Sequence, residues 1–144
     1  MIQEQKQLLL KDLCARLPYG VNVNIINDGY EAFQKGEYDN TLRYHHIEPF
    51  VCDRIEIYPY LRPMSSMTEE EKKEFNKLIG GENTNWQLFD ENRIAHCKSF
   101  YSVFCYFSTM GKIISWCNEH HFDYRGLIPM GLALEAPEGM YKNK

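Results

Sequence analysis

The sequence lacks any long hydrophobic run. No stretch approaches the ~20 apolar residues that a membrane-spanning helix needs. The opening segment, MIQEQKQLLLKDL, has a short apolar run with charges on both sides. It also lacks the basic start and the small-residue cleavage site of a secretory signal. We therefore expect a soluble, cytoplasmic protein that does not associate with membranes.

Basic charge is also scarce. The chain carries 16 lysines and arginines against 20 acidic residues, and its formal net charge is −4. The basic residues are scattered, whereas a protein that binds nucleic acid presents a basic surface that neutralises phosphates. The composition therefore predicts that nucleic acid is not a partner.

Closely paired cysteines are missing as well. The five cysteines include no C-x-x-C pair, and without a secretory signal we expect them to be reduced and mostly buried. The alternative is a zinc site drawn from the second half of the chain: His96, Cys97, Cys105, Cys117 and His120. Structural zinc sites usually use two closely spaced pairs, and only Cys117 and His120 have such a spacing. We predict no bound metal and no cofactor.

Motifs that accompany catalysis are absent. The sequence contains no glycine-rich phosphate loop, no H-E-x-x-H and no G-x-S-x-G,. This absence favours a protein without enzymatic activity but leaves the question open.

What the sequence does contain is typical of a globular protein. Its 144 residues are 44% hydrophobic and 25% charged, which is ordinary for a single domain spanning 1–144. Tyrosine is abundant, with 10 residues. Because tyrosine combines a large contact area with a polar tip, it suits interfaces as well as cores.

The first half predicts a helix followed by a sheet. Leucines four residues apart predict a helix over 3–17, which Pro18 and Gly20 end. Alternating apolar residues, with the turn sequence Asn27-Asp28-Gly29 after the first segment, then predict strands joined by short connections. These strands form a four-stranded antiparallel meander: 21–27, 30–35, 41–47 and 51–58.

The second half predicts mainly helices. Pro59 and Pro63 should end strand pairing, which makes 59–67 an extended exit loop. Thr68 and Glu71 form a capping box at the start of a helix that buries Phe75, Leu78 and Ile79 and stops at Gly80-Gly81.

The remaining segments complete an α+β fold: an N-terminal helix, a four-stranded antiparallel meander and C-terminal helices packed on one face. Their predicted states are a loop over 82–92, a strand over 99–107, a helix over 109–121, a short helical turn and an extended piece over 132–137.

The segment HHFDYRGLI contains candidate site residues. His120, His121 and Asp123 have spacings that suit a metal site or a proton-transfer pair. The favoured interpretation is structural. The histidines lie in the last turn of a helix, where donors suit the exposed carbonyls, Asp123 is the N-cap of the next turn, and Arg125 pairs with an acidic neighbour.

Two other groups of residues are candidates for binding. Tyr58, Tyr60 and Arg62 lie on a proline-stiffened segment, and tyrosine and arginine are common interface anchors. His45 and His46 would point to opposite faces of a strand, so only His45 joins Arg43 in a modest anion-binding surface.

Three segments resemble a family of small proteins, without an assigned activity, from gut Bacteroidales genomes and their prophages. They are DLCARLPYGV (12–21), PYLRPMSSMTEEEKKEF (59–75) and HHFDYRGLIPMGLALEAPEGMYK (120–142). The resemblance implies a bacterial or phage cytoplasm and an accessory protein of a mobile element. Because the family has no assigned activity, the resemblance identifies no catalytic residues in this chain.

The first hypothesis for function is a non-enzymatic binding or interaction module, with a protein partner or as a homo-oligomer. One alternative is a binder of a small ligand, such as a nucleotide derivative, that blocks host defence. Another is a metal-assisted hydrolase centred on His120, His121 and Asp123. A tyrosine-rich exposed patch would favour the first, a closed pocket lined by Arg and Tyr the second, and a bound metal the third.

Overall fold

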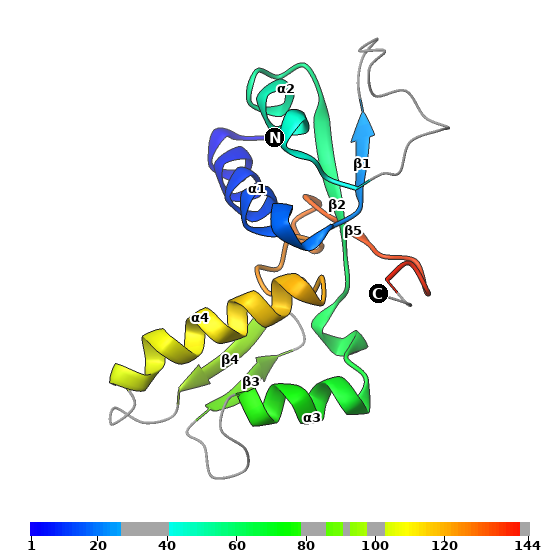
Figure 1. The fold of residues 1–144 in the computed structure, drawn as a ribbon. Coiled ribbons are helices and arrows are strands. Elements are labelled where there is room, and N and C mark those ends of the chain that lie inside the picture. The colour runs from blue at the N-terminus through cyan, green and yellow to red at the C-terminus, as the bar shows by residue number, and fades with distance from the viewer. Residues whose placement is uncertain (27–40, 79–85, 91–92, 98–102, 142–144) are drawn as a thin grey trace. The chain divides into compact units, whose positions relative to one another are not determined.

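The computed structural model describes residues 1–26, 41–78, 86–90, 93–97 and 103–141 (Figure 1). Its contacts divide the chain into two compact units. Unit 1 comprises residues 1–61 and 127–144, and unit 2 comprises residues 62–126. Helices and strands occur in both, so the predicted α+β class is confirmed. The expectation of a single domain stays a prediction.

Unit 1 begins with the predicted N-terminal helix. Helix α1 spans Gln3–Arg16 and buries Leu9 and Leu13 completely. A 3₁₀ turn, η1 (Leu17–Tyr19), follows, with proline in its first turn, where no amide hydrogen is needed,. Gly20 then adopts a φ of 70°, a left-handed conformation that ends the helical segment,.

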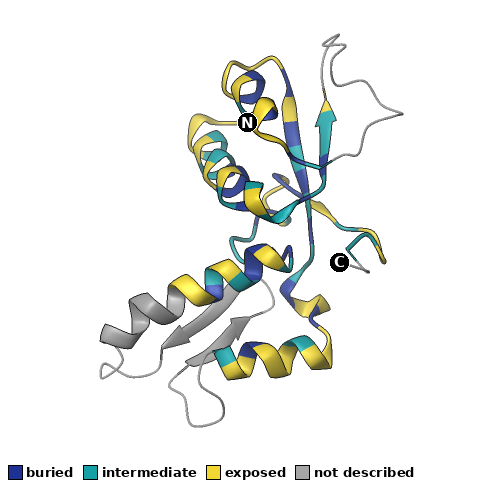
Figure 2. Ribbon diagram, in the orientation of Figure 1, coloured by how far each residue is buried: buried dark blue, intermediate teal, exposed yellow. Residues whose placement is uncertain are grey.

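The sheet of unit 1 has the strand order β1-β2-β5 (Figure 1). Strand β1 (Val23–Ile26) pairs antiparallel with β2 (Glu56–Leu61), and β2 pairs parallel with the short β5 (Leu134–Glu135). Buried and less buried residues alternate along β2 (Figure 2), as a strand with one face on the core requires. The buried core of this unit comprises Leu9, Leu13, Val21, Val23, Leu42, Phe50, Ile55, Ile57, Leu61, Leu127, Leu132 and Ala133.

The predicted strand over 41–47 is wrong. Thr41 makes one isolated bridge with Asn22. The chain then forms a 3₁₀ turn, η3 (Tyr44–His46), and a short helix, α2 (Ile47–Val51). The amide of Arg43 donates to Nδ1 of His46 at 2.9 Å, which caps the start of this helical segment. Pro49 lies in the first turn of α2, where its missing amide hydrogen costs no helical bond.

The meander is therefore not formed as predicted. The last predicted strand, over 51–58, begins only at Glu56, because α2 ends at Val51 and Asp53 turns the chain with a φ of 59°. The predicted return strand over 30–35 and its turn over 27–29 lie outside the described residues.

The prediction that Pro59 ends strand pairing is also wrong. Strand β2 continues to Leu61, and Pro59 lies opposite Val23. The neighbouring amide of Tyr60 donates to the carbonyl of Asn22 at 2.8 Å. Since hydrogen-bonded and non-hydrogen-bonded pairs alternate in an antiparallel ladder, Pro59 occupies a non-hydrogen-bonded position toward β1, where it removes no bond.

Unit 2 contains the predicted capping box. After a 3₁₀ turn, η4 (Met64–Ser66), helix α3 spans Glu69–Leu78. The amide of Glu71 donates to Thr68 Oγ1 at 3.1 Å, and the amide of Thr68 donates to Glu71 Oε1 at 3.0 Å. Phe75 is buried and Leu78 is partly buried, as predicted, whereas the predicted helix end at 79–81 lies outside the described residues.

The rest of unit 2 corrects two predictions. Strands β3 (Trp86–Asp90) and β4 (Arg93–Cys97) form an antiparallel pair where a loop was predicted over 82–92. Helix α4 (Val103–Glu119) begins inside the predicted strand over 99–107. Its apolar aromatic residues fit a helix or a strand equally, so their pattern alone did not discriminate. The buried core of this unit comprises Met64, Met67, Phe75, Ile113, Cys117 and Phe122.

Candidate functional site

The double histidine lies at the end of helix α4, as the structural interpretation predicts. The amide of His121 donates to the carbonyl of Asn118 at 3.2 Å, and the amide of Phe122 donates to the carbonyl of Cys117 at 2.9 Å. His121 has a φ of 64°. These bonds around a left-handed residue define a Schellman motif, and Phe122 and Cys117 are buried in the same cluster, the apolar contact that accompanies it,.

Asp123 does not start a helical turn. The residues after it form turns without a helix, and Gly126 has a φ of 73°. Asp123 is buried, and its amide donates to the carbonyl of Arg62 at 2.8 Å. The predicted helical turn after Asp123 is therefore wrong, whereas the prediction that the Asp123 side chain caps the following turn stays a prediction.

Arg62 is held in the middle of a set of contacts. Its amide donates to the carbonyl of His121 at 2.8 Å. Its guanidinium binds both carboxylate oxygens of Glu71, with Nη1–Oε2 at 2.8 Å and Nη2–Oε1 at 2.6 Å. Cζ lies 4.2 Å from the ring centroid of Phe122. The structure thus brings together four predicted residues (Arg62, His120, His121 and Asp123) around the end of α4.

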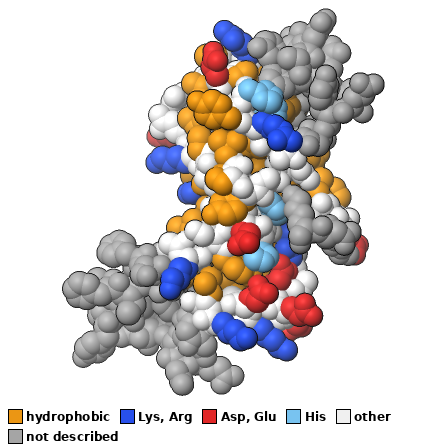
Figure 3. Space-filling model, viewed as in Figure 1, with side chains coloured by type: hydrophobic (Ala, Val, Ile, Leu, Met, Phe, Trp, Pro, Cys, Tyr) orange, Lys and Arg blue, Asp and Glu red, His pale blue; other side chains and the backbone are white. Residues whose placement is uncertain are grey.

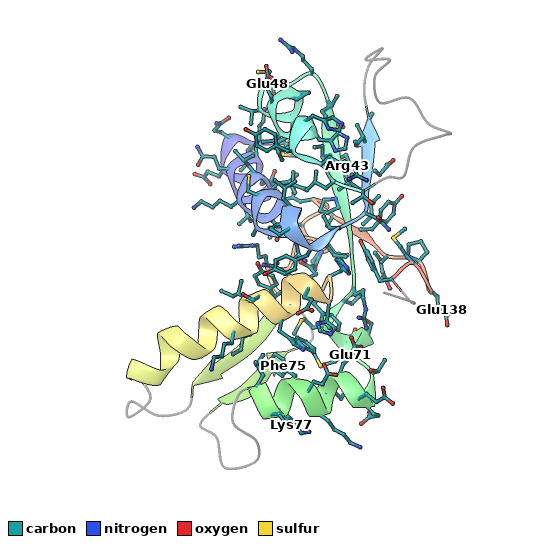
Figure 4. The ribbon with its side chains drawn as sticks, viewed as in Figure 1. Arg43, Glu48, Glu71, Phe75, Lys77 and Glu138 are labelled. Carbon is teal, nitrogen blue, oxygen red and sulfur yellow. The ribbon has the colours of Figure 1, made fainter. Side chains whose placement is uncertain are left out.

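Glu71 is part of this set, and the sequence identified it only as a cap. Its side chain is 14% exposed, and Figure 4 shows it on α3. Burial is the largest influence on the carboxyl and raises its pKa. The hydrogen bonds and charge of Arg62, together with the bonds from Thr68, outweigh burial and hold the pKa below its ordinary value. Glu71 therefore carries a negative charge opposite Arg62 at neutral pH.

His120 links α4 to α3. Its Nδ1 lies 2.9 Å from the carbonyl oxygen of Trp116, and its ring stacks on the Trp116 ring with centroids 4.2 Å apart. Oε2 of Glu74 accepts a hydrogen bond from Trp116 Nε1 at 3.4 Å and lies 3.8 Å from His120 Nε2. These contacts fix the histidine ring against tryptophan and beside one carboxylate.

Metal ligands do not gather at this place. In the part of the chain that the structure describes, no group of three or more His, Cys, Asp or Glu side chains is arranged to hold a metal ion. Among the described thiols, Cys14 and Cys52 are exposed and Cys117 is buried, so the expectation that most of the five are buried stays a prediction. That the protein binds no metal stays a prediction.

The other predicted site residues lie elsewhere. Tyr58 and Tyr60 are half-buried on β2 in unit 1, and the Tyr58 hydroxyl donates to Glu56 Oε2 at 3.2 Å. Burial, followed by the charge and hydrogen bond of Glu56, raises the pKa of Tyr58. Arg125 places its Cζ 5.0 Å from the ring centroid of Tyr124. Tyr58 and Tyr60 thus belong to unit 1, whereas the candidates Arg62, His120, His121, Asp123 and Arg125 belong to unit 2.

Sequence reasoning missed an exposed apolar surface on η3 and α2, which we call the α2 face (Tyr44, Ile47 and Val51). Tyr44 is 85% exposed and Val51 is 48% exposed, while Ile47 is partly buried. The three residues follow a spacing of three and four, so they lie on one side of the helical segment. His46, Pro49 and Phe50 are buried on the opposite side.

The α2 face continues toward the start of α1. Lys6 donates to the carbonyl of Val51 at 3.2 Å and forms an ion pair with Asp53. Ile2, one helical turn before Lys6, is 61% exposed. Figure 3 shows hydrophobic side chains gathered over α1 and α2 on the face it draws. The helical spacing and Pro49 were the signals that could have revealed this surface.

Comparison with known proteins finds no matching family, no matching curated protein and no matching solved structure. The resemblance to proteins of gut Bacteroidales and their prophages therefore stays a prediction. In the described residues, no helix is long and apolar enough to cross a membrane.

Proposed function

We propose that the protein is a non-enzymatic interaction module that binds a protein partner, or a second copy of itself, through the α2 face. The observation that carries this proposal is the 85% exposure of Tyr44. Tyrosine is among the residues that contribute most to binding energy at protein interfaces. From the family resemblance we also propose that the protein acts in the cytoplasm of a bacterium or phage host. The same resemblance suggests that it is an accessory protein of a mobile element.

The backbone around Tyr44 is well suited to such a contact. The bond from the Arg43 amide to His46 Nδ1 fixes the turn that presents Tyr44, and Phe50 anchors α2 in the core of unit 1. A partner therefore orders little backbone when it binds, which lowers the entropy lost on association. Apolar residues at helical spacing fit the mode in which a helix lies in a groove.

Polar residues surround the α2 face. Glu48 is exposed on the same helix, and Arg43 and His45 are exposed beside Tyr44. Figure 4 labels Arg43 and Glu48 near α2. An apolar centre with a polar rim is the usual composition of a protein–protein interface. The rim also supplies charges of both signs, which set the orientation of a partner.

The alternatives have less support. A hydrolase centred on the HHxD segment needs accessible side chains, but His121 and Asp123 are each 2% exposed. The arginine of the Tyr58–Arg62 segment has little capacity for an anionic ligand, because Arg62 is already bound through two nitrogens to Glu71. Both groups serve the local structure, which leaves the α2 face as the better candidate for binding.

The test is photocrosslinking from the α2 face. A photoreactive phenylalanine analogue replaces Tyr44 in the full chain, and the same analogue at exposed Lys73 on α3 is the control. We expect a defined covalent product from position 44, joined to another protein or to a second copy, and none from position 73.

Competition shows whether the product depends on the surface. Excess unlabelled wild-type protein should suppress the crosslink, whereas excess of a Tyr44→Ala/Val51→Ser variant should not. The proposal fails if position 44 gives no product, or if the variant competes as well as the wild-type protein does.

A further inference from the structure

The hydroxyl of Tyr141 lies between strands β1 and β2. The amide of Asn22 donates to the Tyr141 hydroxyl at 3.0 Å, and the same hydroxyl donates to the carbonyl of Tyr60 at 2.6 Å. Asn22 immediately precedes β1, and Tyr60 lies near the end of β2. A side chain from the C-terminal part of unit 1 thus bridges the backbones of two neighbouring strands.

The register shows what this hydroxyl replaces. The β1–β2 ladder runs from Ile26 opposite Glu56 to Val23 opposite Pro59, and the next pair in the same register is Asn22 with Tyr60. A hydrogen-bonded antiparallel pair exchanges two bonds. One bond, from the Tyr60 amide to the Asn22 carbonyl, is present at 2.8 Å. The Tyr141 hydroxyl occupies the place of the reciprocal bond.

A short segment brings Tyr141 to this position. The amide of Ala136 donates to the carbonyl of Leu61 at 2.7 Å, directly after β5. The amide of Met140 then donates to the carbonyl of Pro137 at 3.1 Å, which closes a turn. Gly139, at the third position of this turn, has the positive φ of 84° that glycine adopts most easily,. The turn returns the chain to the sheet at Tyr141.

We propose that residues 136–141 form a clasp with two states. In the closed state, which the structure shows, the Tyr141 hydroxyl joins Asn22 to Tyr60. In the open state the clasp leaves the sheet, and the Asn22 amide donates directly to the Tyr60 carbonyl. Opening also breaks the bond from the Ala136 amide and so releases the Leu61 carbonyl at the end of β2. This proposal does not depend on the α2 face.

The closed and open states of the clasp are stabilised by different contributions to the free energy. Closing forms two hydrogen bonds through the hydroxyl and leaves Tyr141 half-buried. Opening forms one ladder bond and restores conformational freedom to the residues of the clasp, which opposes closing. Exposed segments open more readily than the core of a fold, and Pro137, Glu138 and Gly139 are exposed. The clasp therefore has the balance that a conformational device requires.

The test is nuclear magnetic resonance of the full chain. The scalar coupling across a hydrogen bond, from the Asn22 amide nitrogen to the Tyr60 carbonyl carbon, reports the direct ladder bond. We expect no such coupling in the wild-type protein and a clear coupling in Tyr141→Phe, which lacks only the hydroxyl. Tyr58→Phe is the matched control, because the Tyr58 hydroxyl contacts Glu56 instead, and it should behave as wild type.

A second variant keeps the hydroxyl. Gly139→Val strains the turn at its positive φ, so the direct coupling from the Asn22 amide nitrogen to the Tyr60 carbonyl carbon should also become detectable in this variant. This result stands even if the phenylalanine variant does not fold. The proposal is overturned if Tyr141→Phe shows no direct coupling. It is equally overturned if Tyr141→Phe leaves the Asn22 amide exchanging without protection, or if Gly139→Val shows no direct coupling.

Discussion

Arg62 holds Glu71 through two parallel hydrogen bonds, of 2.8 and 2.6 Å, while its guanidinium lies over the ring of Phe122. We predict that Arg62→Ala lowers the free energy of unfolding by about 2 kcal/mol, because it removes hydrogen bonds to a charged group. Arg62→Lys should recover only part of this loss, since lysine cannot form the paired geometry. Urea denaturation measures both. The control is Arg54→Ala at an exposed position. If Arg62→Ala left the free energy of unfolding unchanged, the bonds to Glu71 would contribute nothing to stability, and Arg62 would be available to a partner.

Glu71 predicts an acid-sensitive contribution to stability. Its pKa is below its ordinary value in the folded protein, so its ionised form is favoured by folding,. The contribution is fully present above the ordinary glutamate value of about 4.3 and is lost as the pH falls through the lowered folded value. The difference in urea midpoint between wild type and Glu71→Gln should therefore shrink on acidification. A constant difference from neutral to strongly acidic pH would contradict the assignment.

Tyr141 predicts the opposite response, at alkaline pH. Burial is the largest influence and raises the pKa of Tyr141 to about 12, against smaller opposing effects of the Asn22 bond and Arg16. Folding thus favours the neutral hydroxyl. This stability is fully present below the unfolded value of about 10 and is lost as the pH rises through the folded value. Tyr141→Phe should flatten the alkaline decline of the urea midpoint, whereas Tyr58→Phe should flatten it less.

The buried ion pair of α1 predicts a large and asymmetric effect. Asp12 and Arg16 are both 0% exposed, with Oδ2 and Nε 2.7 Å apart. Asp12→Ala leaves a buried guanidinium without this carboxylate and should cost about 3–5 kcal/mol. The double variant Asp12→Leu/Arg16→Met should be less damaged, because it removes both charges. Chemical denaturation compares them, and a double variant worse than Asp12→Ala would refute this account.

The two sides of α2 predict contrasting stability. Tyr44→Ala should change the free energy of unfolding by less than about 0.5 kcal/mol, because its side chain is exposed,. Phe50→Ala, on the buried side, should cost about 3–5 kcal/mol,. Thermal melts of the two variants give the comparison. A strongly destabilised Tyr44→Ala would show that the residue serves the fold, and the α2 face would lose its main support.

Local signals in the sequence were sufficient for some elements. The capping box of Thr68 and Glu71 was predicted because its two partners are three residues apart and bond to each other's backbone. The end of α4 was predicted at His121 and lies at Glu119. It could be placed this closely for a similar reason, since helix termini need donors and acceptors close in the chain. Helix α1 was likewise predicted from a local signal, the spacing of its leucines.

Other features depend on residues that are distant in the sequence. Pro59 is compatible with β2 only because of its register with Val23, which no local pattern contains. The bond between Asn22 and Tyr141 joins residues 119 positions apart. The pattern around Tyr44 and Ile47 fitted a strand as well as a helix, and the bond from Arg43 to His46 favoured the helix.

The bridge from Tyr141 to Asn22 also has a consequence for the order of folding during synthesis. Unit 1 is assembled from both ends of the chain, whereas unit 2 is continuous from 62 to 126. Domains tend to fold as their residues leave the ribosome, at roughly 5–20 residues per second. All residues of unit 2 are therefore translated before unit 1 is complete, and the last bridge between β1 and β2 waits until Tyr141 has emerged. Translation stalled just before that residue would hold the nascent chain with this part of its sheet unfinished.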